Sequence, residues 1–250
     1  MAADTSTSRD QANLLAAEQD KAWVAWSSGK DCLWALHLAR QSYELEIAGL
    51  LTTVTQTYGR VSMHGVREVL LQSQADALGL PLRRLLIPAQ CSEEVYDALM
   101  RRTLEQALEL GIRKIIFGDI FLAGVRAYRE RRMAEIGMEP LFPLWGRDTG
   151  SLAREMIEAG VRAYVTCLDP RKLPRDLAGR SFTSEFLERL PEGVDALGEN
   201  GEFHTFAWDG PGYAYPIPIS VGQTLEREGF IFTDLLPAPA PQQPGRRQRE

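Results

Sequence analysis

A short polar stretch separates two apolar segments near the start of the sequence. Residues 27–31 read Ser-Ser-Gly-Lys-Asp, between the apolar run Val-Ala-Trp and a helix-like run that begins Cys-Leu-Trp-Ala-Leu. Backbone N–H groups at a strand-to-helix turn, together with the helix dipole, favour an anion. Gly29 lets the backbone approach a phosphate closely, Lys30 supplies a positive charge, and the hydroxyls of Ser27 and Ser28 add donors. We therefore interpret this loop as a site for the phosphates of ATP.

The loop follows neither of two common phosphate-binding motifs. A Walker A sequence requires a glycine where Val24 stands and a serine or threonine where Asp31 stands. The dinucleotide fingerprint GxGxxG does not occur in the sequence. A polar turn that only caps a helix could have the same composition. The phosphate-binding interpretation therefore depends on the position of the loop, which directly follows the first predicted strand.

Predicted strands alternate with predicted helices over the first two thirds of the chain. This alternation favours an α/β fold with a doubly wound, mainly parallel sheet. Ligands bind such sheets beyond the carboxyl ends of the strands, where residues 27–31 lie. We expect strands at residues 21–26, 46–53, 82–87, 114–117 and 163–168, and helices at 31–41, 66–78, 93–110, 125–136 and 151–159.

The composition of the chain changes after Asp169. Residues 194–219 are rich in glycine, proline and aromatic residues, and the last stretch is rich in proline and arginine. We expect a flexible leader over residues 1–20 and an ATP-binding domain over residues 21–168. A smaller C-terminal α+β substrate region is expected over residues 169–236, followed by a disordered tail over residues 237–250.

The overall composition is that of an ordinary soluble globular protein. The 250 residues are 44% hydrophobic and 25% charged, with a formal net charge of −6, which does not favour a nucleic-acid partner. The three cysteines are far apart and form no CxxC pair, so neither a zinc site nor a disulfide framework is predicted. Because no signal sequence or membrane-spanning apolar run is visible, we expect a cytoplasmic protein without a membrane partner.

Three separate stretches, in the same order along the chain, resemble one protein family. Residues 27–31 resemble the phosphate loop SGGxDS of the N-type ATP pyrophosphatases, which are adenine nucleotide alpha hydrolases with a HUP-type fold. Residues 117–165 resemble the central block of the diphthine–ammonia ligase family, and residues 198–211 resemble its C-terminal signature GEGGEYETF. The sequence departs from these motifs at Cys32, which replaces a serine, at Asn200, which replaces a glycine, and at His204, which replaces a glutamate.

The resemblance implies an ATP-dependent ligase that adenylates a carboxylate and amidates it with ammonia or an amine, releasing AMP and pyrophosphate. The family's acceptor is diphthine on elongation factor 2, and the implied cofactors are ATP and Mg²⁺. The acceptor of this chain is expected to be a small-molecule or protein-borne carboxylate. A nucleotide-binding regulator without ligase activity and a tRNA-modifying ATP pyrophosphatase are the alternatives. A homodimer through residues 213–219 is a further expectation.

The resemblance also assigns roles to individual residues, and Asp31 is in addition the candidate Mg²⁺ ligand. The expected catalytic residues are Lys30, Asp31, Glu199 and Glu202. The expected ATP-binding residues are Ser27, Ser28, Gly29, Lys30, Asp31, Cys32, Leu51, Thr52, Gly118 and Asp119. The expected acceptor-binding residues are Glu199, Asn200, Gly201, Glu202, His204 and Thr205, and Arg126, on the predicted helix after Asp119, is expected to bind the substrate as well.

Several of these positions also have a structural interpretation. Arg126 and Arg129 are three residues apart on a charged helix and could clamp phosphate or an acidic substrate, whereas Arg131 and Arg132 are interpreted as surface residues. Cys32 fits a buried, inert thiol. His204 fits either a structural residue or a proton shuttle, and the two glutamates of the signature also fit a solvated β-turn.

Overall fold

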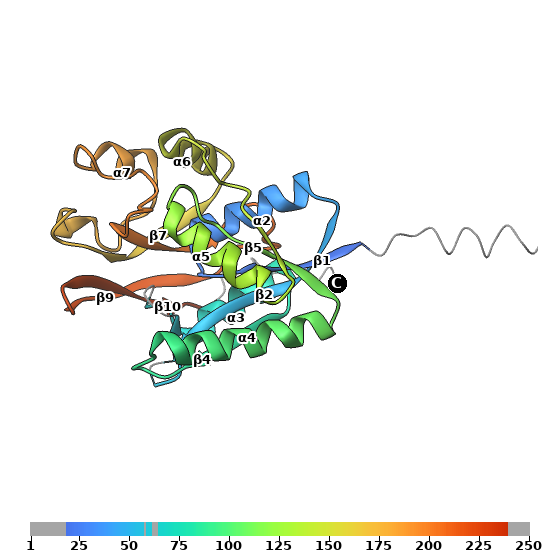
Figure 1. Ribbon diagram of the computed structural model, residues 1–250. Helices are drawn as coiled ribbons and strands as arrows, with labels where there is room; N and C mark the ends of the chain where they lie inside the picture. The colour runs from blue at the N-terminus through green and yellow to red at the C-terminus, as the bar shows by residue number, and fades with distance from the viewer. Residues whose placement is uncertain (1–18, 58, 62–64, 240–250) are drawn as a thin grey trace, which may run out of the picture.

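The computed structural model describes residues 19–57, 59–61 and 65–239. Most of the predicted leader and most of the predicted tail lie outside the described residues. Two β-sheets form the framework of the described chain, and helices surround the first of them (Figure 1). The predicted α/β class with a mainly parallel sheet is confirmed.

The first sheet contains five parallel strands and one short antiparallel strand. Its central strand, β1 (Asp20–Ala25), lies between β2 (Leu45–Thr55) and β5 (Ile112–Ile116) and is parallel to both. Central parallel strands are covered on both faces, which explains their apolar composition. The sheet is completed by β4 (Leu82–Ile87) beside β2, β6 (Glu139–Leu141) beside β5, and the antiparallel β3 (Arg60–Val61).

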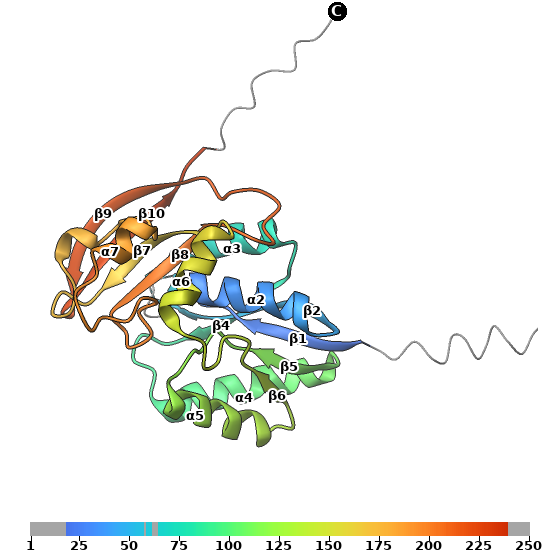
Figure 2. The same ribbon diagram turned by 90° about the horizontal axis from the view of Figure 1, so that it is seen from above.

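Helices cover both faces of this sheet. Figure 2 shows α2 (Lys30–Ser42) and α3 (Glu68–Leu78) on one face, and α4 (Glu93–Glu109) and α5 (Ala123–Ala134) on the other. Each face has its own apolar core, and the larger core also includes the second sheet and α6 (Thr149–Glu158). Helix α2 is apolar on most sides because it packs between the two sheets, which explains the apolar run after residue 31.

The strand order creates a switch point beside β1. The chain proceeds from β1 to β2 on one side and later returns to β5 on the other. The loops that follow β1 and β5 therefore diverge at the carboxyl edge of the sheet, which is where ligands bind open α/β sheets. These two loops contain residues 26–29 and 117–122, which include several of the predicted site residues.

The second sheet is antiparallel and has the order β8-β7-β10-β9. It corrects the sequence analysis on one point: β7 (Arg162–Leu168), predicted as the last strand of the parallel sheet, pairs antiparallel with β8 (Phe203–Asp209) and β10 (Phe230–Pro237). Because β7 follows a helix, the sequence pattern resembles another βαβ unit. Its partner strands, however, lie further along the chain. The edge strand β9 (Ile219–Arg227) and β10 were not predicted. The domain limits themselves stay a prediction.

Two shorter helices and the expected dimer segment complete the C-terminal region. A 3-10 helix (Arg175–Leu177) and α7 (Ser184–Glu188) precede β8. In residues 213–219, the Tyr215 side chain is exposed and Ile217 is buried, and the homodimer stays a prediction. Within the described parts of the chain, we find no helix with both the length and the apolar character needed to cross a bilayer.

Candidate active site

The loop after β1 is fixed in place by strand β8. The Lys30 N–H donates to the Thr205 hydroxyl oxygen over 3.1 Å, and the Ala207 N–H donates to the Ser28 carbonyl over 2.9 Å. Gly29, at the N-cap of α2, has no side chain to cap the helix, so Thr205 supplies the capping oxygen from a distant strand. Thr205 therefore holds the loop that was predicted to bind phosphate.

Ser28 has a backbone conformation that favours glycine. Its φ angle is +73°, in the left-handed region, and its side chain is fully buried. The motif SGGxDS, which the loop resembles, has glycine at this position. Non-glycine residues in this region cluster at functional sites, where surrounding contacts hold them.

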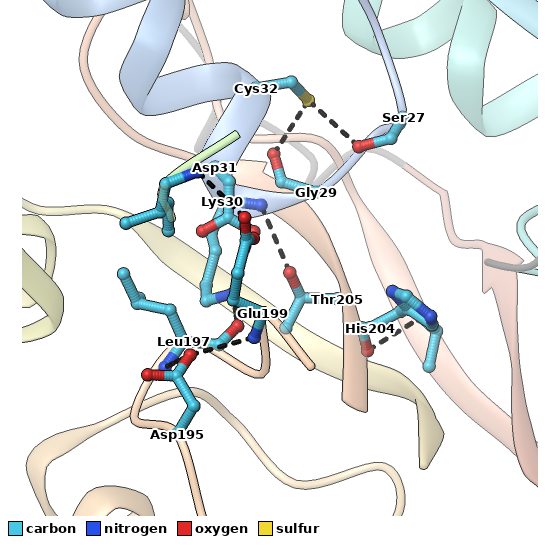
Figure 3. Close-up of polar contacts among 12 residues, drawn as sticks. Ser27, Gly29, Lys30, Asp31, Cys32, Asp195, Leu197, Glu199, His204 and Thr205 are labelled. Atoms are coloured by element: carbon cyan, nitrogen blue, oxygen red, sulfur yellow. Dashed lines mark hydrogen bonds and ion pairs between the residues drawn. The ribbon is translucent and has the colours of Figure 1, made fainter. Parts of the chain in front are cut away.

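The structure places the Lys30 side chain away from the position expected of a mobile phosphate ligand. The side chain is 1% exposed, and its ammonium group donates to the Leu197 carbonyl over 2.6 Å and to the Asp31 carboxylate over 3.0 Å (Figure 3). It also lies 5.0 Å from the ring centroid of Phe203. Lys30 therefore joins the start of α2 to the turn before β8.

Three carboxylates gather where the two loops meet. Glu199 accepts a hydrogen bond from the Ile120 N–H over 2.8 Å, so the C-terminal signature reaches the loop after β5. Burial raises the pKa of Glu199 to about 7, and repulsion from Asp31 and Asp119 adds to the effect. Burial also raises the pKa of Asp31, although the Lys30 ammonium opposes that shift. Asp31 Oδ1 is buried and has no hydrogen-bond partner among the described residues.

A cavity of about 570 Å³ opens at this point and runs toward α4 and α5. Ten of the predicted site residues line it: Ser27, Asp31, Cys32, Leu51, Thr52, Gly118, Asp119, Glu199, His204 and Thr205. Seven others do not: Ser28, Gly29, Lys30, Arg126, Asn200, Gly201 and Glu202. The structure therefore brings together segments separated by more than one hundred residues of sequence.

Gly118 allows the two loops to come close together. A Cβ atom at this position would lie 3.0 Å from the Asp31 carbonyl carbon and 3.1 Å from the Cys32 nitrogen. Because these are backbone atoms, they could make room only if the start of α2 moved. The glycine therefore determines how closely the loop after β5 approaches Asp31.

Helices α4 and α5 supply a cavity wall that the sequence analysis did not predict. Arg129 pairs with Asp119 at 2.6 Å, and Arg132, which was interpreted as a surface residue, lines the cavity and pairs with Asp97. Tyr128 also donates to Asp97 over 2.7 Å. On α5, cavity-lining residues recur three or four positions apart, a helical spacing that could have identified this wall. The wall residues are Tyr96, Asp97, Met100, Arg101, Leu104, Tyr128, Arg129, Arg132, Met133, Glu135 and Ile136.

Comparison with known proteins identifies the family to which this arrangement belongs. The family model for the diphthamide synthase N-terminal domain matches residues 20–140, and the model for the C-terminal domain matches residues 148–233. The chain is 30% identical to a diphthine–ammonia ligase of Danio rerio over 176 residues, which cover 63% of this chain and 68% of that protein. The chain belongs to the diphthine–ammonia ligase family.

Mammalian proteins of the same name are also similar. The ligase of Rattus norvegicus is 28% identical over 175 residues, and that of Homo sapiens is 26% identical over 173 residues. In both comparisons the match covers 63% of this chain and 65% of the relative. The resemblance stated from the three sequence motifs is confirmed.

Within the C-terminal signature of the diphthine–ammonia ligase family, the two glutamates lie in different surroundings. Glu199 lines the cavity, whereas Glu202 is 3% exposed and accepts from the Asn200 side-chain amide over 3.2 Å. The Glu202 carbonyl also accepts from the Asp169 N–H. Glu202 and Asn200 thus contact each other within the turn and do not line the cavity, and Glu202 Oε2 is buried without a hydrogen-bond partner among the described residues.

Arg126 also lies outside the cavity. Its guanidinium pairs with Glu130 at 2.7 Å, one turn along α5, and lies 4.6 Å from the Trp145 ring centroid. A stacked, paired arginine has little freedom to clamp a substrate. The arginines that line the cavity are Arg101, Arg129 and Arg132.

The thiol and the imidazole at the cavity are held in their neutral forms. Burial raises the pKa of Cys32 to about 11, and the thiol donates to the Gly29 carbonyl over 3.1 Å, which fits the inert thiol of the sequence analysis. Burial lowers the pKa of His204 to about 4, and the nearby Lys30 ammonium contributes. At neutral pH the His204 ring therefore carries no charge.

The carboxylates suit a Mg²⁺ ion that is shared with a phosphate-bearing ligand. The described residues contain no group of three metal-ligating side chains that could hold an ion by themselves. Mg²⁺ is commonly bound by one or two carboxylates together with substrate phosphates. The unpartnered Oδ1 of Asp31 fits such an arrangement.

Proposed function

We propose that this protein is an ATP-dependent ligase that adenylates a carboxylate and amidates it with ammonia or an amine, releasing AMP and pyrophosphate. The observation that carries the proposal is the entry of Glu199, from the C-terminal signature, into the cavity that Ser27 and Asp31 line. A purely nucleotide-binding protein would not need a second, half-buried carboxylate there. Membership of a family whose relatives are named diphthine–ammonia ligases supports the same reaction class.

In this proposal, the loop after β1 receives the pyrophosphate part of ATP. The N-terminus of α2 and the hydroxyl of Ser27, a residue that lines the cavity, stabilise the negative charge that grows as the bond between the α and β phosphates breaks. Thr52 extends the site toward the nucleoside, since its hydroxyl is buried and has no hydrogen-bond partner among the described residues. Leu51 lines the same part of the cavity.

Asp31 is the residue that would hold Mg²⁺ together with phosphate oxygens. The ion would supply positive charge against the leaving pyrophosphate. The Lys30 ammonium fixes the Asp31 carboxylate from the protein side, at 3.0 Å, and thereby keeps it directed toward the ligand. Lys30 thus acts through Asp31 in this proposal.

Glu199 binds and orients the ammonium ion or the amine. Its carboxylate is held by the Ile120 N–H and is partly exposed to the cavity. When the amine displaces AMP from the acyl group, the acyl C–O bond breaks, the C–N bond forms and the nitrogen loses a proton, which a carboxylate at this position can accept. Holding the two reactants together lowers the entropic part of the barrier.

The test is transfer of nitrogen from isotopically labelled ammonium into an acceptor. The protein is incubated with Mg-ATP, labelled ammonium and elongation factor 2 that carries diphthine, and small carboxylic acids are tested in parallel. The proposal predicts labelled amide in one acceptor with equal amounts of AMP. Binding of ATP without turnover on any acceptor would favour the regulator, and ATP consumption that requires tRNA would favour the tRNA-modifying enzyme.

A further inference from the structure

A buried amide outside the cavity holds the phosphate loop. Gln74 lies on α3 and is fully buried. Its side-chain oxygen accepts from the Trp26 indole N–H over 2.8 Å. Its amide nitrogen donates to the Ser28 carbonyl over 2.9 Å and to the Ala207 carbonyl over 2.7 Å. One side chain thus joins α3, the end of β1, the loop after it and β8.

The type of side chain matters at this position. Only a neutral amide can accept from an indole N–H and also donate to two carbonyl groups. The Ser28 carbonyl receives a second hydrogen bond from the Ala207 N–H, so both of its lone pairs have donors. An apolar side chain on α3 would pack in the same space but would leave three buried polar groups with fewer partners.

The contacts of Gln74 fix one peptide unit of the loop. In a trans peptide the C=O and the following N–H point in opposite directions. Because the Ser28 carbonyl is directed toward Gln74 and Ala207, the Gly29 N–H must point the other way. The same contacts hold Ser28 at its φ of +73°, a conformation that a serine rarely adopts without support.

We propose that Gln74 is a positioning residue that fixes both neighbours of the cavity-lining Ser27, the Trp26 side chain and the Ser28 carbonyl, and so holds the loop in the shape that binds a phosphate of the nucleotide. This inference rests on the proposed function, because it takes residues 27–31 as the phosphate-binding loop. Gln74 does not line the cavity, so it acts through Trp26 and Ser28, the residues on either side of the cavity-lining Ser27. Its loss should weaken the recognition of phosphates and leave recognition of the nucleoside unchanged.

The test compares Gln74→Met with Gln72→Met, a matched change on a more exposed part of α3. Affinities for Mg-ATP and for adenosine are measured by calorimetry on the full chain. For Gln74→Met we expect a loss of about tenfold or more for Mg-ATP and less than about twofold for adenosine. Gln72→Met should bind both ligands like the wild type.

Each other result counts against a defined part of the inference. Unchanged Mg-ATP affinity in folded Gln74→Met overturns it, and so does an equal loss of adenosine and Mg-ATP, which would indicate general damage to the site. If Gln74→Met does not fold, Gln74→Asn, a neutral amide that is one methylene shorter and cannot keep all three contacts, should show the same loss confined to Mg-ATP. A wild type that does not bind Mg-ATP would overturn the proposed function and this inference with it.

Discussion

The Lys30 ammonium donates a hydrogen bond to the Leu197 carbonyl over 2.6 Å, so the only lysine of the phosphate loop points into the turn before β8. Its charge is compensated by Asp31 and by two aromatic rings, those of Phe182 and Phe203. The lysine therefore couples the two parts of the chain that form the cavity. A change at Lys30 should affect folding as well as the site.

Lys30→Met is expected to lower the free energy of unfolding by about 2–4 kcal/mol, because it leaves the Leu197 carbonyl without its donor and Asp31 without its counter-charge. Lys172→Met is the control, since the Lys172 side chain is exposed and its ammonium group donates to the Asn200 carbonyl. Urea unfolding measures both. Equal stabilities of the two variants would contradict the buried role of Lys30.

Ser28→Gly is expected to raise the free energy of unfolding by about 0.5–1 kcal/mol, because glycine adopts the left-handed conformation without steric cost. The change also removes a buried hydroxyl that has no hydrogen-bond partner among the described residues. Ser27→Gly is the control, because Ser27 is not at positive φ and should gain nothing. Chemical denaturation measures the stability of both variants. A Ser28→Gly protein that is less stable than the wild type would contradict the proposed backbone strain at Ser28.

Gly118→Ala is expected to weaken Mg-ATP binding by about tenfold or more, because its Cβ would press on the backbone of Asp31 and Cys32. Gly124→Ala is the matched control, since a Cβ there meets nothing within 4 Å. Alanine should even stabilise α5 slightly at that position. Calorimetric titration of both folded variants is the measurement. Wild-type affinity for Mg-ATP in Gly118→Ala would show that nucleotide binding does not depend on the close contact between Gly118 and the backbone of Asp31.

Glu199 should make the unfolding free energy depend on pH. Its folded pKa is raised to about 7 from an ordinary value of 4.5, so the folded state binds more protons between these values. Stability from this group is therefore present at low pH and is lost as the pH rises from about 4.5 to about 7. Glu199→Gln should remove that loss. The unfolding free energy of the variant, compared with that of the wild type, should therefore be higher at about pH 8 than at about pH 5. Urea unfolding at a series of pH values, with a chelator present, measures the effect. If the unfolding free energies of the wild type and Glu199→Gln change with pH in the same way, the prediction is contradicted.

Much of the fold and part of the site could be predicted from local sequence signals. The loop at residues 27–31 could be identified as a candidate site because it follows the first predicted strand of a parallel sheet, where such sheets bind ligands. The alternation of strands and helices likewise predicted the parallel sheet. Gly118 and Asp119, which follow a short buried strand, line the same cavity as Ser27 and Asp31, and their role toward a nucleotide stays a prediction.

The features that were missed depend on contacts between distant residues. Nothing near Lys30 in the sequence indicates that Leu197 will accept its hydrogen bond, and nothing near β7 indicates a partner in β10. Glu199 and Glu202 are only three residues apart, yet the turn directs one to the cavity and buries the other. Gln74 was not noticed because a single glutamine in an amphipathic helix usually faces solvent.

The most direct test of the proposed nucleotide chemistry is to identify which bond of ATP is broken. The purified protein is incubated with Mg-ATP, ammonium and the acceptor found by nitrogen transfer, and the nucleotide and phosphate products are quantified, with Asp31→Asn in parallel. We expect AMP and pyrophosphate in equal amounts from the wild type and a strong loss of both in Asp31→Asn. ADP and orthophosphate as the only products would contradict it.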